Sequence, residues 1–240
     1  MVVGLYGVGY AYAAWQLDRA FPFIAIGLAG KILGPIGWII SELPVRTFPL
    51  IVFDDLIWWV PFALFLLEGT AVARFLKRTA PQWCVAIHIV AAIAAVLFLR
   101  AYTDPTTWRA GWLMWMAAAI SLAGFYAWWG ARIGQWLPFA IASLGLACDF
   151  SGESIYIGWT PSRAADLLTG AAGNGLYTIA GMLLTVKTPA LAFRWLAWLT
   201  WSSGIALTVM TILDIRVGVV ISSAALMIFF IPFVVLMARR

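Results

Sequence analysis

The chain has 240 residues, of which 64% are hydrophobic and only 10% are charged. Soluble domains carry about 25% charged residues and about 45 to 50% apolar ones, so this composition excludes an ordinary water-exposed surface. The net charge of +5 comes from Lys and Arg residues that are scattered without a basic stripe, which argues against nucleic acid as a partner and makes the lipid bilayer the expected one.

Nine apolar runs follow one another, and each is long enough to cross a hydrocarbon core of roughly 30 Å. Alternating strand patterns are absent, so the runs predict an all-α fold: a polytopic transmembrane helical bundle of about nine spans, eight to ten at the limits. We expect a single transmembrane domain over residues 1–240 and no soluble domain. The predicted spans are 2–17, 21–41, 47–67, 82–101, 109–130, 136–159, 168–187, 192–213 and 217–238.

The first two runs differ in their polar content. Run 2–17 has no Lys or Arg before Arg19, unlike the charged start of a signal peptide, and is predicted to be a retained helix. Run 21–41 holds Lys31, the only positive charge deep in a predicted span, and Pro35 removes the helical donor to the Lys31 carbonyl. This pattern predicts a broken or kinked helix. Lys31 is interpreted as the counter-ion of an acid, either as a structural ion pair or as part of a binding site.

Run 47–67 carries two adjacent acids, Asp54 and Asp55, followed by Trp58 and Trp59. Adjacent residues on a helix diverge by about 100°, so the two carboxylates are not expected to face one point. We expect Asp55 to turn inward and Asp54 to reach toward the headgroups. The tryptophans indicate either an interfacial aromatic belt or the wall of a substrate pocket.

Run 82–101 contains His88, the only histidine of the chain, which excludes metal sites built from several histidines. We interpret His88 as a hydrogen-bonded residue that packs helices together. The two cysteines, Cys84 and Cys148, are too few for a cysteine metal site and are expected to be small buried residues. The sequence therefore predicts no metal and no cofactor.

The stretch LACDFSGESIYIGW in run 136–159 places Asp149 and Glu153 one helical turn apart, with Tyr156 on the same face. Two like charges at this spacing repel, so one carboxyl is expected to keep its proton at neutral pH unless a cation lies between them. The pair is thus a candidate general acid beside a carboxylate. The alternative is a structural pair that is bonded to neighbouring helices.

Run 168–187 begins within GAAGNGLYTIAG, where Asn174 indicates either an amide that lines a polar pocket or simply close helix packing. On a nine-span topology the four acids, Lys31 and Asn174 gather between the midplane and one face. Four carboxylates against one ammonium must be balanced by protons, a cation or water.

The sequence also contains a weak internal match, in which residues 26–44 and 120–138 are identical at seven of nineteen positions. It is consistent with a repeated three-helix unit, a device common in transporters, or with chance in a restricted alphabet. Lys and Arg are more frequent in alternate loops, which predicts a cytoplasmic C-terminus, in a bacterial inner membrane.

Two classes of function fit these features. The favoured hypothesis is a cofactor-independent membrane enzyme that uses carboxyl acid and base chemistry on an apolar lipid or isoprenoid substrate, as a cyclase or isomerase does. Its candidate catalytic residues are Asp149, Glu153, Asp55 and Asp54, and its candidate binding residues are Lys31, Asn174, Tyr156, Trp58 and Trp59. The alternatives are a small proton- or cation-coupled transporter or channel, or a non-catalytic subunit of a membrane complex.

Overall fold

The computed structural model describes residues 20–44, 47–68, 70–100, 105–158, 162–188, 190–191 and 193–239, and all regular structure in these ranges is helical. The all-helical class predicted from the apolar runs is therefore confirmed over the described residues. The helices are α2 (Phe21–Ile40), α3 (Phe48–Ile51), η3 (Val52–Leu56), α4 (Ile57–Leu66), α5 (Ala71–Arg78), α6 (Ala80–Arg100), α7 (Pro105–Arg132), α8 (Leu137–Gly158), α9 (Arg163–Asp166), η4 (Leu167–Gly173), α10 (Asn174–Lys187), α11 (Arg194–Ile212) and α12 (Arg216–Ala238). The letter η marks a π-helix.

The predicted runs from 21–41 onward all fall on helical segments, whereas run 2–17 lies outside the described residues. Five helical stretches in the described chain are long and apolar enough to cross a membrane, which indicates a membrane protein. They are Phe21–Trp38, Trp108–Arg132, Arg163–Lys187, Arg194–Ile212 and Arg216–Ala238. A shorter apolar helix covers Ala80–Val96. Helix α8, which carries the Asp149 and Glu153 pair, is not one of the five, so the count of nine spans stays a prediction.

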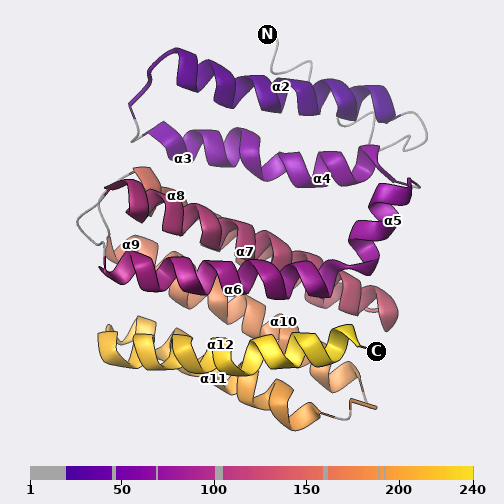
Figure 1. Ribbon diagram of the computed structural model, residues 1–240, viewed down its shortest axis with the longest axis vertical. Helices are drawn as coiled ribbons and strands as arrows, with labels where there is room; N and C mark the ends of the chain where they lie inside the picture. Colours follow the sequence, from indigo (N-terminus) through magenta and orange to yellow (C-terminus); the bar gives the residue numbers. More distant parts are fainter. Residues whose placement is uncertain are drawn as a thin grey trace. The chain divides into compact units, whose positions relative to one another are not determined.

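The chain divides into two compact units, residues 1–76 and 77–240, and a single domain over the whole chain stays a prediction. In the first unit, α2 packs against the continuous helical segment α3, η3 and α4. In the second unit, α6 packs against α7 and α12, and α7 packs against α8. Helix α10 contacts both α8 and α11, and α11 lies alongside α12 (Figure 1).

Aromatic side chains from three helices form the core of the second unit. Trp129 of α7 and Trp201 of α11 lie 5.4 and 5.6 Å from the ring of Phe233 of α12. The polar groups of this core form hydrogen bonds within it. Trp201 Nε1 donates to Thr185 Oγ1 at 2.7 Å, and the hydroxyl of Tyr126, on α7, donates to the Tyr177 carbonyl at 2.8 Å. Buried indole and phenol groups usually have such partners.

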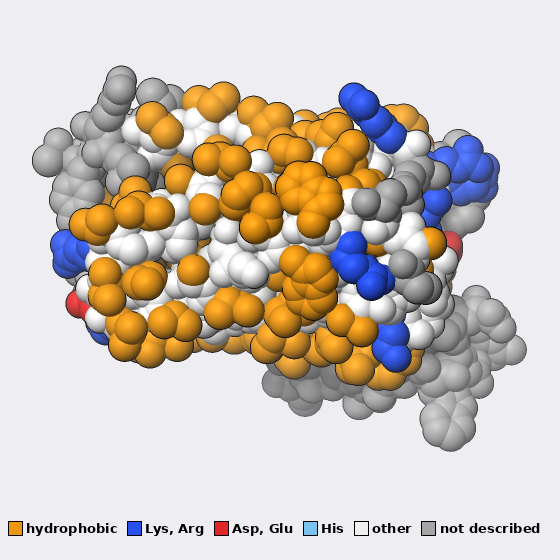
Figure 2. Space-filling model, turned by 90° about the horizontal axis from the view of Figure 1, so that it is seen from below, with side chains coloured by type: hydrophobic (Ala, Val, Ile, Leu, Met, Phe, Trp, Pro, Cys, Tyr) orange, Lys and Arg blue, Asp and Glu red, His pale blue; other side chains and the backbone are white. Residues whose placement is uncertain are grey.

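The outer surface of α11 and α12 is apolar along the middle of the helices. Exposed large side chains there include Leu199, Ile205, Val209, Val217, Val220, Ile221 and Ile228. In the space-filling view from this side, hydrophobic side chains cover the centre and Lys and Arg side chains lie toward the two ends (Figure 2). An apolar band between charged ends is the pattern of a surface that faces lipid.

Two stretches that the sequence predicts as ordinary helix are π-helical, η3 in the first unit and η4 in the second. Close backbone approach accompanies η4. A methyl group on Gly152 of α8 would overlap the Thr169 methyl group and would lie 2.8 Å from the Ala165 carbonyl oxygen. Glycine at position 152 therefore lets α8 lie directly against the start of the next helical segment.

Replacing Gly152 with alanine is expected to destabilise the second unit by about 1–3 kcal/mol, because the added methyl group has no room. The matched control is Gly124→Ala in α7, where a methyl group would meet nothing within 4 Å. That variant is expected to be neutral or to gain up to about 1 kcal/mol, since alanine favours helix over glycine. Thermal unfolding of both variants in detergent measures the difference, and equal stabilities would contradict the packing argument.

Candidate functional site

The second unit brings the two predicted acids of α8 into a buried environment. Glu153 is only 2% exposed, and Asp149 is half-buried. The Tyr177 hydroxyl on α10 donates to Asp149 Oδ2 at 3.3 Å. Glu153 Oε2 is buried and has no hydrogen-bond partner among the described residues. The pair is therefore only partly satisfied, and a lone buried carboxyl oxygen is costly if the group is charged.

Glycines on both sides allow this burial. A methyl group on Gly173, at the end of η4, would lie 3.1 Å from Asp149 Cβ and 3.2 Å from the Gly145 carbonyl oxygen. A methyl group on Gly145 would in turn lie 3.0 Å from the ring of Tyr177. The backbone of η4 and the tyrosine that contacts Asp149 thus both approach α8 closely at Gly145.

Tyr156 lies on the predicted face of α8 but uses its hydroxyl elsewhere. The hydroxyl donates to Asp166 Oδ1, and the ring stacks on Trp112 with 4.1 Å between ring centres. Tyr177, which the sequence reasoning did not single out, supplies the hydroxyl that contacts the acid pair. The sequence gives only a weak indication of this role, which is that Tyr177 lies three residues after Asn174 and hence on the same helical face.

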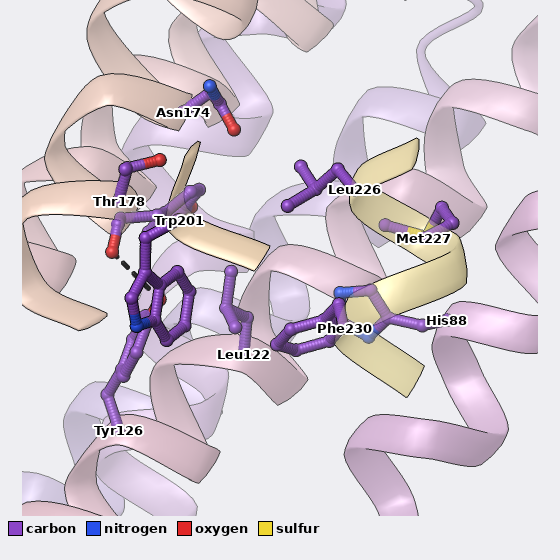
Figure 3. A pocket seen from close by; sticks show the side chains of 10 residues that line it. His88, Leu122, Tyr126, Asn174, Thr178, Trp201, Leu226, Met227 and Phe230 are labelled. Carbon is purple, nitrogen blue, oxygen red and sulfur yellow. Dashed lines mark hydrogen bonds between the residues drawn. The ribbon is translucent and has the colours of Figure 1, made fainter. Parts of the chain in front are cut away.

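A cavity of about 40 Å³ lies in the second unit (Figure 3). Tyr177 belongs both to its lining and to the hydrogen bond with Asp149. The other lining residues are His88, Leu122, Tyr126, Asn174, Thr178, Trp201, Leu226, Met227 and Phe230. Asn174 therefore does line a pocket, as one of its two sequence interpretations held. Its amide nitrogen donates to the Gly204 carbonyl at 2.7 Å and to Thr208 Oγ1 at 2.9 Å.

His88 also lines the cavity, and its interpretation as a hydrogen-bonded residue that packs helices together is confirmed. It is 4% exposed, and its ring lies 4.9 Å from the ring of Phe230. Its Nδ1 lies 2.7 Å from the carbonyl oxygen of Cys84, one turn earlier in α6. A carbonyl oxygen can only accept, so Nδ1 carries the proton and Nε2 is the acceptor nitrogen of the neutral ring.

The first unit holds the remaining predicted acids, around Lys31 of α2. Lys31 Nζ lies 3.1 Å from Asp54 Oδ1 and 3.5 Å from Asp55 Oδ1. The predicted ion pair of Lys31 is therefore present and includes both acids. The two aspartates differ in burial, since Asp55 is 5% exposed whereas the Asp54 side chain is 80% exposed. The expected inward turn of Asp55 and outward turn of Asp54 are both found.

The prediction that Asp54 and Asp55 cannot face one point is wrong, because both carboxylates contact the same ammonium group. The reason is local geometry. The two residues lie in η3, whose wider turn brings neighbouring side chains closer in direction than an α-helix does, and the long lysine side chain spans the remaining gap. Gly34 makes room for this, since a methyl group there would overlap the carboxylate of Asp55.

Of the two outcomes predicted at Pro35, a break or a kink, the break is not found, because α2 runs from Phe21 to Ile40 with Pro35 inside it. The carbonyl of Lys31, which Pro35 deprives of its helical donor, accepts a hydrogen bond from Trp59 Nε1 at 2.9 Å. Trp59 is therefore a hydrogen-bonding partner of α2. Its neighbour Trp58 is exposed and packs against Phe62, with 5.9 Å between ring centres.

The predicted site residues thus form two groups, one in each unit. In the first, Lys31 contacts Asp54, Asp55 and Trp59. In the second, Tyr177 contacts Asp149, one turn from Glu153 on α8, and also lines the cavity together with Asn174. A shared depth for the two groups stays a prediction. In the described part of the chain no group of three or more His, Cys, Asp or Glu residues is arranged to hold a metal ion.

Comparisons with known proteins add no family to this description. No protein-family model matches the chain, and neither a curated protein nor a solved structure matches it. The fold and the apolar helices define the coarse class, a helical membrane protein. The function has to be argued from the two groups of side chains.

Replacing Trp59 with phenylalanine is expected to cost the first unit about 1–2 kcal/mol, because the Lys31 carbonyl then loses its donor. In a Pro35→Ala background the alanine N–H can supply that donor, so the same tryptophan substitution is expected to cost less. A double-mutant cycle on unfolding in detergent measures the coupling. Trp58→Phe is the control, with an expected change within about 0.5 kcal/mol. Equal costs in both backgrounds would show that the indole bond does not compensate for Pro35.

Proposed function

We propose that the chain is a multi-pass integral membrane protein that moves protons, or a cation in place of a proton, by way of the Asp149 and Glu153 pair. This is the work of a small proton- or cation-coupled transporter or channel. One observation carries the proposal: of two carboxyl groups one turn apart, the half-buried Asp149 has a hydroxyl partner and the buried Glu153 has an unbonded oxygen.

The charge balance of the second unit supports a proton at this pair. In the described residues, neither Asp149 nor Glu153 forms an ion pair with Lys or Arg, whereas Asp54 and Asp55 both do. Two unpaired carboxylates in an apolar interior would cost several kcal/mol each. Binding a proton or a cation removes this cost, and releasing it restores the charge. The carboxyl pair can therefore bind a proton or cation and release it again when the surroundings of the pair change.

The enzyme hypothesis stays a prediction, and the cavity gives it limited support. The cavity has aromatic neighbours, as a pocket for an apolar substrate would. Its volume of about 40 Å³, however, is far below the roughly 300–1,000 Å³ typical of ligand pockets. A space of this volume does not hold an isoprenoid chain.

Infrared spectroscopy of the full chain in liposomes tests the proton site without knowledge of any transported substrate. A carbonyl stretch from a protonated carboxyl group is expected to appear and disappear as the pH is stepped. Asp149→Asn and Glu153→Gln are each expected to remove most of that change, because each leaves a single carboxyl without its coupled neighbour.

The matched control is Glu42→Gln, which removes an exposed carboxyl just beyond α2 and is expected to leave the difference spectrum unchanged. A wild-type spectrum without a titrating carboxyl band would refute the proton site. Lipid extracts of cells that express the same variants address the enzyme hypothesis. Accumulation of an apolar precursor in both Asp149→Asn and Glu153→Gln, without loss of the infrared band, would favour the enzyme over the transporter.

We further propose nine spans with a cytoplasmic C-terminus in a bacterial inner membrane. Counting by loop supports this orientation: Arg19, Arg74, Lys77, Arg78, Arg132, Lys187, Arg194, Arg239 and Arg240 fall on one side, and Arg46, Arg100, Arg109, Arg163 and Arg216 fall on the other. Positive residues are enriched on the cytoplasmic side of such proteins.

Reporter fusions test this orientation. A fluorescent protein fused after Arg240 is expected to fluoresce, since it folds in the cytoplasm. Alkaline phosphatase fused after Ile215, between α11 and α12, is expected to be active, since it requires the periplasm. The reverse pattern at both positions would overturn the orientation but would leave the carboxyl pair unaffected.

A further inference from the structure

We propose that one end of the second unit binds the headgroups of anionic phospholipids in the folded protein. This surface, named the basic end below, comprises the starts of α6, α8 and α11 and the ends of α7, α10 and α12. The inference goes beyond the proton function and does not depend on it, because none of the residues involved belongs to the carboxyl pair.

Contacts between helices bring these starts and ends together. Short connections join the end of α7 to the start of α8 and the end of α10 to the start of α11. Trp129 of α7 donates from Nε1 to Thr188 Oγ1, just after α10, at 3.1 Å. The ring of Phe193, just before α11, lies 6.0 Å from that of Phe233 in the second half of α12. The basic end is therefore one continuous region of the second unit.

The charge of the basic end is positive and unbalanced. Among the described residues 77–240, no Asp or Glu lies there, whereas six Lys and Arg residues do: Lys77, Arg78, Arg132, Lys187, Arg194 and Arg239. All of them are exposed except Arg194, which is partly buried. The opposite end differs, because Arg163 there pairs with Asp214 at 3.5 Å and Asp166 adds a second acid. Phosphate groups of anionic lipids complement the basic end.

Exposed tryptophans mark the depth of these charges. Trp83 of α6, Trp136 before α8 and Trp195 of α11 are 47, 75 and 64% exposed. Exposed indole rings at the ends of membrane helices lie at the level of the lipid headgroups. Each of the three follows a Lys or Arg residue by five positions or fewer. In the space-filling view, Lys and Arg side chains gather beside hydrophobic ones at the end on the right (Figure 2).

The turn between α10 and α11 gives the basic end a fixed point of attachment. Arg194 Nη2 donates to the Thr188 carbonyl at 2.8 Å, which anchors the guanidinium. Its Nε is buried and has no hydrogen-bond partner among the described residues. Guanidinium groups bind phosphate oxygens through pairs of N–H donors, and an anchored side chain loses little freedom on binding. Arg194 and the nearby Lys187 thus offer donors and charge to one lipid phosphate.

These features differ from what membrane insertion alone requires. Positive residues in loops direct the orientation of a chain during insertion, and that role needs no lipid bound to the folded protein. An anchored guanidinium and tryptophans beside the charges are properties of the folded surface. They favour lasting contact with headgroups.

Spin-labelled lipids measure this contact with the full chain in phosphatidylcholine liposomes. Spin-labelled phosphatidylglycerol is expected to associate with the protein at least about threefold more strongly than spin-labelled phosphatidylcholine at low salt, since one Lys or Arg near an anionic surface contributes up to about fivefold. In about 1 M salt the preference is expected to vanish, because the Debye length falls to about 3 Å. Equal association of both lipids at low salt would overturn the proposal and would leave the basic end to water or an acidic protein.

Two double variants of equal charge locate the contact. Lys187→Gln with Arg194→Gln is expected to reduce the preference for phosphatidylglycerol by about half or more. The matched control, Arg109→Gln with Arg216→Gln, removes two exposed arginines from the opposite end and is expected to leave most of the preference in place. Equal losses in both would show that only net charge matters and would refute a site at the basic end.

A second pair keeps the test decisive if Arg194→Gln fails to fold. Lys187→Gln with Arg239→Gln changes two exposed side chains at helix ends and leaves the anchored guanidinium intact. It is expected to lower the preference by more than the control pair does. A preference that the control pair lowers more would overturn the proposal. The titrating carboxyl band of the proton site is expected to be the same in all of these variants, so each proposal fails or stands on its own measurement.

Discussion

The cost of a carboxylate charge in an apolar interior is the constraint on which the arrangement of polar residues depends. The two units meet it differently. In the first, Lys31 lies within 3.5 Å of both aspartates, so a fixed positive charge offsets them. In the second, Asp149 and Glu153 have a tyrosine hydroxyl and no such charge in the described residues. A fixed counter-ion makes a stable pair, whereas its absence leaves a place for a mobile one.

Backbone geometry makes both burials possible. Asp55 lies in a π-helical turn and packs against Gly34, and Asp149 packs against Gly173 at the end of the other π-helical turn. A π turn changes the direction of the side chains that follow it, and a glycine opposite lets the carboxyl approach a neighbouring backbone. Such turns are rare and often accompany functional sites. Their presence next to the buried acids of both units agrees with a role for those acids beyond packing.

The sequence was sufficient for features that depend on composition. Apolar runs located the helices, because a long run in lipid has no other stable conformation. Charge balance correctly paired Lys31 with an acid. The sequence was insufficient where backbone geometry and tertiary contacts decide the outcome. The contact of both Asp54 and Asp55 with Lys31 depends on a π turn. The Lys31 carbonyl that Pro35 leaves without a helical donor accepts a hydrogen bond from Trp59, 28 residues away along the chain. Tyr177 was missed for the same reason, since its partner Asp149 lies on another helix.

Residue types alone do not separate the two classes of function. Acids and aromatic rings suit both lipid chemistry and ion movement, which is why the sequence left both open. A lipid substrate needs a pocket that matches its own bulk, and a cavity of about 40 Å³ does not provide one. A proton needs only a chain of groups that can each accept and donate. Carboxyl and phenol groups are such groups, and here they come from α8 and α10 of one packed unit.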